Sequence, residues 1–591
     1  MEPNSAHEGL SSVPCANIKG TGLSATNCKE RAIKTCDGCL LVKKDHWNLH
    51  RLDCVEGLRS PDWQPGWIRE GRQPVFAVSN VASSDNTFRV LKCLWAAVPA
   101  FDVLNLKVNE GANFDKDVAL CFADAEDLRN VIVSVVGMPV EYKKICSYAI
   151  NCNDITMTAR NVVILLISTL LPPEQAAKLI LHVWYSARLT PRMIQSLEGH
   201  VRRFIAEGVE KCRAISEADQ MQSMEWNFDS RVVRISLRSW QWEHILKILD
   251  SRPLLNDAER RRKQVVLAET DVDARDRQYN LLRPSERVSV HKLRKTGVLL
   301  PFGFGVNEYD YHLFGLLHPN PTMYDPDTGA WLQRPLYEAN SSWNRAQILT
   351  SGARHGVPKE DINGHTYFHV LDTLTAFCKK LRSLNVRFYM YSVNPQSLPE
   401  LLEKTTTISS FDRIDASRLA DIRNPAAQTK DGTSVLEITL LALGRLLKTP
   451  VQNPYAVLIT LFSNATEHAF KALGEDHAKV AQEHSMKRVA KFMDWNQDMS
   501  SPYYLKFMDA CIVFQDYDML FEKYMDMIGL VEVGDRQGMK MKEPNSVIES
   551  WPHRMKKRAV EKGAQAEFEA VLASFTLGEG RYVEWVRKIL N

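Results

Sequence analysis

The sequence predicts a mixed α/β protein, in which a small Cys/His-rich segment precedes a large body built on a parallel sheet. Two observations lead to this prediction. Cysteines and histidines gather within residues 15–54, and beyond residue 88 short apolar runs alternate with helical segments. Such alternation is typical of a parallel sheet that is covered by helices.

Composition narrows the class of protein. An apolar fraction of 45% and a charged fraction of 25% are those of a globular protein, and 591 residues are enough for several structural units. The net charge of +3 is too small for a strong nucleic-acid signal. There is no apolar run of about 18–20 residues and no secretory leader pattern. We therefore expect a soluble protein of the cytoplasm and/or nucleus, without membrane contact.

The chain divides by pattern into seven parts. The first is polar and predicted to be disordered, and the third is a linker rich in Pro, Gly and Trp that we expect to pack against another element. The parts are a tail (1–14), the Cys/His cluster (15–54), the linker (55–87), a first α/β part (88–215), an insertion (216–370), a second α/β part (371–470) and a mostly helical C-terminal region (471–591).

The stretch "TCDGCLLVKKDHWNLHRLDC" has the pattern of a structural zinc site. Cys36 and Cys39 are three apart, so a tight knuckle points both thiolates at one ion. His50 and Cys54 are four apart, so a helix places them on one face. Three thiolates and one imidazole form the closed tetrahedral set of structural zinc, and metal binding and folding should be coupled in so small a unit.

A wider pattern, "PCANIKG…NCKE…TCDGCLLVK…HWNLHRLDC", resembles the MYND zinc finger found at the N-terminus of many fungal proteins. A full finger of that family holds two ions with eight ligands. Cys15 and Cys28 match its first pair, but the third pair is absent between Lys43 and Lys44. The resemblance implies one complete zinc site and a weak or incomplete second one, for which His46 is either a substitute ligand or an exposed histidine. MYND fingers dock short peptides that often contain proline, so protein or peptide partners are implied.

The resemblance continues into the body. The segments "LWAAVPAFDVLNLKVNEG", "DVALCFADAEDLRNVIVSV" and "INCNDITMTARNVVILL" are similar to a domain of unassigned function that follows the finger in those fungal proteins. A related domain occurs in the cytoplasmic factor that helps to assemble axonemal dyneins. "FDRIDASRLAD", "NPYAVLITLFSNA" and "GRYVEW" extend the likeness toward the C-terminus. The resemblance implies an adaptor or assembly factor.

The order of strand-like runs is also similar to that of class I methyltransferases, which have a Rossmann-like sheet. The four units begin with "DVALCFA" (117–123), "CSYAI" (146–150), "VRFYMYSV" (386–393) and "FDRIDASRL" (411–419). The long middle region then becomes an insertion between the second and third units. We expect a methyltransferase-like sheet on this basis.

The positions that would hold S-adenosylmethionine are weakened. The turn after the first strand, "ADAEDLR", has no glycine, although glycine is needed where backbone approaches a cofactor closely. Asp154 is placed to hold a ribose or to cap the next helix. Asn394 stands where many methyltransferases have an aspartate. The sequence therefore predicts an inactive body, and a divergent S-adenosylmethionine-dependent methyltransferase is the alternative.

No catalytic residue is predicted. Cys121 and Cys152 lie in or beside apolar runs, which predicts buried and unreactive thiols. Two histidines in "GHTYFHV" (364–370) have no metal-ligating partner at useful spacing.

Overall fold

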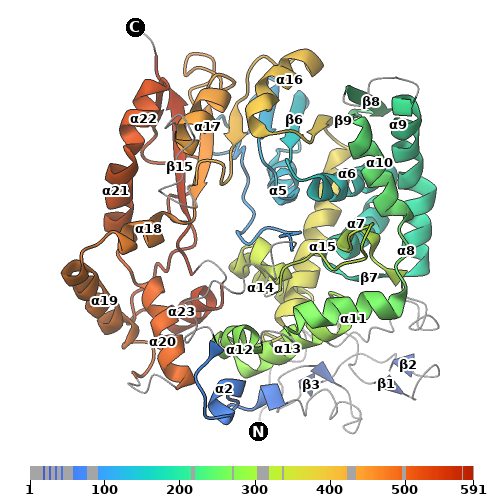
Figure 1. The fold of residues 1–591 in the computed structure, drawn as a ribbon. Helices are drawn as coiled ribbons and strands as arrows, with labels where there is room; N and C mark the ends of the chain where they lie inside the picture. Colours follow the sequence, from blue (N-terminus) through green and yellow to red (C-terminus); the bar gives the residue numbers. More distant parts are fainter. Residues whose placement is uncertain are drawn as a thin grey trace.

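The computed structural model describes most of the chain beyond residue 56, as Figure 1 shows. The backbone of four two-residue strands is described before that point: β1 (Ile18–Lys19) pairs with β2 (Thr26–Asn27), and β3 (Lys34–Thr35) pairs with β4 (Val42–Lys43). The other described residues are 57–75, 91–213, 220–268, 272–302, 318–335, 338–421, 434–495, 501–574 and 577–589.

A nine-stranded, mostly parallel sheet forms the centre of the body, which confirms the α/β prediction. The strand order across it is β14-β15-β13-β12-β5-β6-β11-β9-β8. The run from β13 to β9 is parallel, whereas β15, β14 and β8 join by antiparallel pairing. The strands are β5 (Val118–Phe122), β6 (Ile145–Asn151), β8 (Met221–Phe228), β9 (Arg231–Arg238), β11 (Asn385–Tyr391), β12 (Arg413–Asp415), β13 (Val457–Phe462), β14 (Met539–Met541) and β15 (Arg581–Arg587).

The central strands are buried on both faces, which explains their continuous apolar sequences. In β5 every residue is buried, and alternate side chains point to opposite faces. Leu120 and Phe122 join one hydrophobic cluster, while Ala119 and Cys121 join another. The sheet therefore separates two cores.

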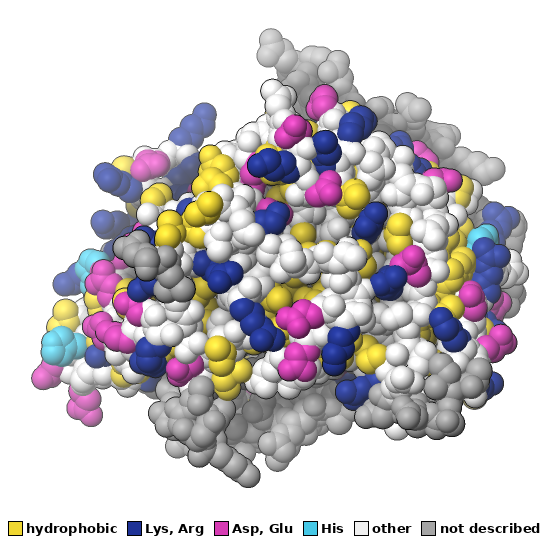
Figure 2. All heavy atoms as spheres, turned by 90° about the horizontal axis from the view of Figure 1, so that it is seen from above, with side chains coloured by type: hydrophobic (Ala, Val, Ile, Leu, Met, Phe, Trp, Pro, Cys, Tyr) yellow, Lys and Arg dark blue, Asp and Glu magenta, His cyan; other side chains and the backbone are white. Residues whose placement is uncertain are grey.

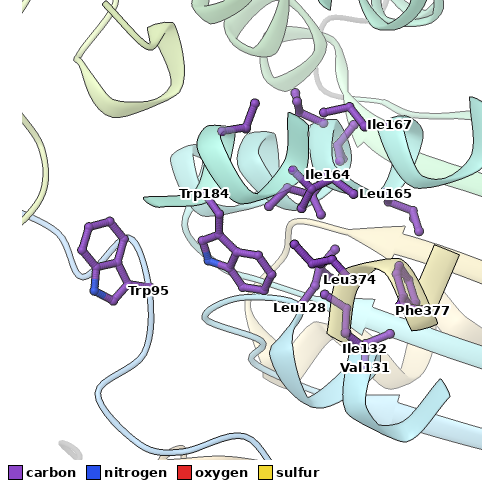
Figure 3. Packing of buried hydrophobic residues seen from close by; sticks show 14 of the residues in the cluster. Trp95, Leu128, Val131, Ile132, Ile164, Leu165, Ile167, Trp184, Leu374 and Phe377 are labelled. Carbon is purple, nitrogen blue, oxygen red and sulfur yellow. The ribbon is translucent and has the colours of Figure 1, made fainter. Parts of the chain in front are cut away.

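Four helices cover the first face: α5 (Arg129–Gly137), α6 (Ile155–Leu170), α7 (Pro173–Tyr185) and α15 (Ile362–Leu381). Figure 3 shows Leu374 of α15 beside Ile132 of α5, with Trp184 of α7 close to both. Nearly every residue of α6 is buried, as expected for a helix that is apolar all round. This helix is the longest apolar run of the sequence. Within the described residues, no helix is long and apolar enough to cross a membrane.

The second face is covered by helices from later in the chain. They are α16 (Leu398–Thr405), α17 (Val435–Gly444), α18 (Ala465–Lys471), α21 (Tyr517–Ile528) and α22 (Leu530–Arg536). Helices on both faces of a mostly parallel sheet are typical of α/β proteins, because each face is apolar and must be covered.

The region predicted as an insertion does not lie apart from the sheet. Its hairpin β8–β9 pairs with β11 and extends the sheet, a feature that the sequence-based division did not include. The other elements between β6 and β11 are β7 (Arg188–Leu189), α8 (Pro191–Ser196), a π-helical turn (Leu197–Arg202), α9 (Arg203–Arg213), α10 (Ser239–Asp250), α11 (Leu255–Val266), α12 (Val272–Leu281), α13 (Pro284–Thr296), β10 (His318–Pro319) and α14 (Arg345–Arg354).

The C-terminal region is mostly helical, as predicted, but it also returns to the sheet. Helices α19 (Glu475–Val489), α20 (Pro502–Val513) and α23 (Ala564–Leu572) contribute to a third, smaller hydrophobic cluster. Strand β15 then inserts between β13 and β14. "GRYVEW" is therefore a sheet strand rather than the end of a helical region.

The described part of the predicted linker packs against α13, in the region predicted as an insertion. It contains a 3-10 turn (Gly57–Arg59) and α2 (Gly66–Arg69). The Arg287 guanidinium of α13 donates hydrogen bonds to the Leu58 and Ser60 carbonyl oxygens, at 2.8 and 2.9 Å, and lies 4.8 Å from the centre of the Trp63 ring. This side of the molecule is seen at the bottom of Figure 1.

Candidate functional site

The strand order places a candidate crevice between β5 and β12. From β5 the chain moves outward to β6 and β11, and it later returns to the opposite side of β5 as β12 and β13. Ligands of open α/β sheets bind outside the carboxyl ends of the strands at such a reversal point. The residues that follow these strands are therefore the candidates for ligand contact.

The turn after β5 is held tightly against the sheet. The Ala123 amide donates to the Asp415 carbonyl oxygen at 2.9 Å, and the Ala125 amide donates to the Asn151 carbonyl oxygen at 2.7 Å. Both alanines are buried. The absence of glycine noted in the sequence thus coincides with a turn in which the Ala123 and Ala125 amides are bonded to protein, so these two amides are not available to a ligand.

Asn151 is the residue that joins the strand ends, and sequence analysis missed it. Its side chain is fully buried at the end of β6. The amide nitrogen donates to the carbonyl oxygens of Ala123 and Val393, both at 2.9 Å, and the amide oxygen accepts from the Val393 amide at 3.0 Å. One side chain therefore links the ends of β5, β6 and β11. The signal for this residue in the sequence was an amide side chain at the last position of an apolar strand.

Asp154 is the N-cap residue of α6. Its carboxylate accepts from the Thr156 and Met157 amides at 2.9 and 3.2 Å, which is the capping alternative considered from the sequence. Lys92 also donates to both carboxylate oxygens, at 2.7 and 2.8 Å. The carboxylate is 40% exposed, and these contacts already engage it. Its role as a ribose ligand remains a prediction.

The acidic turn after β5 is neutralised from within the protein. Buried Asp127 accepts from the Ala96 amide at 3.0 Å and from the Arg129 guanidinium at 2.8 Å. Glu126 forms an ion pair with Arg418, which follows β12. Burial raises the pKa of Asp124 to about 6. Most of the negative charge of this turn is thus engaged in contacts within the protein.

Asp415 at the end of β12 is also occupied. Its carboxylate accepts from the Asn130 side-chain amide and from the Ser417 amide, both at 2.9 Å. Burial raises the pKa of this carboxyl group above its usual range. On the other flank, Asn394 is exposed and caps a short turn through the Gln396 amide at 3.0 Å.

The segment before β5 forms a wall beside the crevice. The Leu94 amide donates to the Gln333 side chain at 2.6 Å, and the Ser342 hydroxyl donates to the Ala96 carbonyl oxygen at 2.6 Å. These bonds tie residues 91–96 to loops of the insertion. Figure 3 shows Trp95 on this segment, to the left of Trp184 of the core in that view.

The predicted zinc ligands lie outside the described residues: Cys15, Cys28, Cys36, Cys39, His46, His50 and Cys54. In the part of the chain that is described, no group of three or more His, Cys, Asp and Glu side chains is arranged to hold a metal ion. Cys121 and Cys152 are buried, as predicted, and burial raises the pKa of both thiols, which disfavours the reactive thiolate.

Comparison with known proteins adds one match. A family described as a domain of unknown function (DUF4470) matches residues 94–189, from the wall segment through β5, α5, β6, α6 and α7 to β7. The chain matches no curated protein and no solved structure. The matched interval contains Asn151 and Asp154, together with the three segments for which a fungal resemblance was noted.

Proposed function

We propose that this protein is a zinc-binding interaction protein, an adaptor or assembly factor, whose methyltransferase-like body does not use S-adenosylmethionine. The observation that carries the proposal is the buried Asn151 amide, which links the ends of three strands where the cofactor would approach. A body of this kind provides a stable scaffold, and recognition of partners is assigned to the finger.

The likeness to class I methyltransferases is supported by strand order. If β5, β6, β11, β12 and β13 are numbered along the chain, they lie in the order 3-2-1-4-5, which is the order of doubly wound nucleotide-binding sheets. Fold likeness alone does not imply activity.

The zinc assignment rests on the spacing of cysteines and histidines in the sequence. Strands β3 and β4 pair in antiparallel register, Lys34 with Lys43 and Thr35 with Val42, and Cys36 and Cys39 fall between them in the sequence. Cys36, Cys39, His50 and Cys54 would hold one zinc ion, which would organise the finger without taking part in chemistry.

The first test is the zinc content of the purified protein, measured by elemental mass spectrometry. We expect one zinc per chain, and we expect Cys36→Ser to remove it. A proline-containing peptide array should then show binding to the wild type and no binding to Cys36→Ser. A protein without zinc, or peptide binding that survives Cys36→Ser, would contradict the interaction role of the finger.

The alternative function is a divergent methyltransferase, which the strand order and the partly exposed Asp154 carboxylate favour. Calorimetric titration with S-adenosylmethionine at millimolar concentration decides between the two. We expect no binding heat. Saturable binding that is lost in Asp154→Ala would establish the alternative and overturn the proposal of an inactive body.

Figure 2 bears on a nucleic-acid role. On the face it shows, Lys and Arg side chains are interspersed with Asp and Glu, rather than gathered into one basic surface. A protein that follows a phosphate backbone needs a contiguous basic patch or stripe. That face therefore does not favour nucleic-acid binding, and the proposal of protein or peptide partners rests on the predicted finger.

A further inference from the structure

A cavity of about 730 Å³ lies far along the chain from the finger and the sheet crevice, between the insertion and the C-terminal helices. Elements α12, α13 and α14 form one side, and α20 and α23 form the other, which Figure 1 shows next to each other in its lower part. The volume is in the usual range of about 300–1,000 Å³ for small-molecule sites. A second cavity of about 300 Å³ shares Leu281, Glu286, Arg345 and Leu572 with it, so the two adjoin.

The floor of the larger cavity is aromatic. Phe492 stacks on Phe568 with ring centres 4.9 Å apart, and both belong to the third hydrophobic cluster. At the mouth, Trp495 is 37% exposed and Tyr503 is 61% exposed. Exposed aromatic side chains beside a cavity provide flat apolar surface for a ring-containing ligand.

The polar side of the cavity is positively charged. Glu286 is buried, and its carboxylate is shared by the Arg283 guanidinium, at 2.9 Å, and by the Arg345 guanidinium. Two cations on one carboxylate give this wall a positive charge, which Glu569 and Glu360 offset in part at Arg283. Arg283 and Arg345 retain side-chain exposures of 33% and 21%, so both can still donate to a ligand.

Lys506 of α20 adds a second cation on the opposite wall. Within the described residues, its ammonium group forms no hydrogen bond or ion pair, although the residue is partly buried. Burial, together with the nearby Arg287 charge, lowers the pKa of Lys506, and the Glu569 and Glu286 carboxylates offset only part of this effect. A partly buried cation without a partner is costly unless something pairs with it. Exposed Lys359 lies at the same cavity, and the carboxylates of Asp494 and Glu569 are the other charged groups of its lining.

We propose that this cavity binds an organic anion with an apolar, ring-containing body. The body lies on the Phe492–Phe568 floor, and the carboxylate, sulfonate or phosphate group pairs with Lys506 and with the Arg283–Arg345 wall. The cavity contains neither a zinc ligand nor a residue of the sheet crevice, so its role is independent of the function proposed above.

The test uses two probes with the same ring system on the full-length protein. 8-Anilinonaphthalene-1-sulfonate carries a negative charge, and N-phenyl-1-naphthylamine is the same body without the sulfonate. In fluorescence titrations we expect the sulfonate to bind the wild type at least about tenfold more tightly than the neutral probe, as a charged hydrogen bond in a partly buried site allows. Equal affinities would overturn the proposal.

Two variants locate the site. Lys506→Met keeps the stem and removes the charge, so it should reduce the preference for the sulfonate several-fold, with the Arg283–Arg345 wall retaining part of it, while leaving the neutral probe bound. Lys479→Met is the matched control, because Lys479 is exposed on α19 and is not part of the cavity lining. If both variants bind the sulfonate equally, Lys506 is not part of the site.

A third variant tests the cavity independently of charge. Ala566 is exposed and lines the cavity, so Ala566→Trp should fill it and weaken both probes. Circular dichroism confirms the fold of each variant. Should Lys506→Met fail to fold, Ala566→Trp decides the question. Unchanged binding of both probes to a folded Ala566→Trp would overturn the proposal.

Discussion

At the scale of single residues, the carboxyl edge of the sheet depends on side chains whose partners are distant in sequence. Asp154 stands out in the sequence because a helix cap can be recognised locally. Asn151 could not be given a role in the same way, since one of its partners, Val393, is 242 residues away. The sequence therefore identified Asp154 beside the crevice and missed Asn151, whose side-chain amide closes the crevice.

The closing role of Asn151 leads to a stability prediction. Asn151→Ala removes three hydrogen bonds and leaves buried backbone groups of Ala123 and Val393 without partners. We expect a loss of about 2–4 kcal/mol in the free energy of unfolding, measured by denaturant titration. Asn394→Ala is the control, because this exposed amide makes a single turn-capping bond and should cost about 0.5–1 kcal/mol. Equal effects would mean that the link between strand ends is energetically unimportant.

Glu579 provides a pH-dependent prediction. Burial raises its pKa to about 7, with the Thr466 hydroxyl as its hydrogen-bond donor at 3.1 Å and the Glu467 charge nearby. A raised carboxyl pKa means that the folded state holds the proton more strongly than the unfolded state. Its contribution to stability is therefore complete below the unfolded pKa of about 4.3 and is lost as pH rises toward 7.

Glu579→Gln should remove this dependence. We expect the variant to be more stable than the wild type at pH 8 by roughly 1–2 kcal/mol, and the difference to vanish near pH 4. Thermal unfolding of both proteins across this pH range measures it. A constant difference at every pH would show that packing, rather than titration, separates the two proteins.

At the scale of elements, the strands that were predicted are those buried on both faces. β5, most of β6 and the second half of β11 appear as apolar runs, which a sequence displays directly. β8 and β9 were missed because many of their side chains are only half-buried and include charged residues. β15 was missed because its burial depends on insertion between β13 and β14, which the local sequence does not reveal.

The insertion of β15 depends on close approach of helix α22. The Trp585 side chain of β15 is fully buried, and a Cβ at Gly534 would lie 2.6 Å from its ring. Gly534→Ala should therefore destabilise the protein by about 1–3 kcal/mol in a denaturant titration. At Gly199 an added Cβ would meet no heavy atom within 4 Å, so Gly199→Ala should be neutral or stabilising by up to about 1 kcal/mol. A neutral Gly534→Ala would show that β15 and α22 can move apart.

At the scale of the whole molecule, the body builds hydrophobic clusters of its own. Among the described residues, their buried members lie between Leu94 and Trp585, and Leu58 and Trp63 of the linker add partly buried contacts. We predict from this extensive core that the body is stable without the finger. The finger, if it binds zinc, should depend on the metal because so short a segment cannot bury a core of its own.

Chelation tests this independence. We expect a strong zinc chelator to leave the main thermal transition of the protein unchanged while residues 15–54 become sensitive to protease. Cys36→Ser should reproduce both results without chelator. A shift of the main transition on chelation would instead mean that the finger contributes contacts to the body.

The sequence by itself determined the α/β class, the buried central strands, the burial of Cys121 and Cys152 and the position of a cysteine-histidine cluster, because each follows from local spacing or periodicity. Only the tertiary structure decided which strands flank β5, how Asn151 closes the strand ends, and that α12–α14 meet α20 and α23 around a charged cavity. These features join residues hundreds of positions apart, and long-range pairing depends on packing rather than on local pattern.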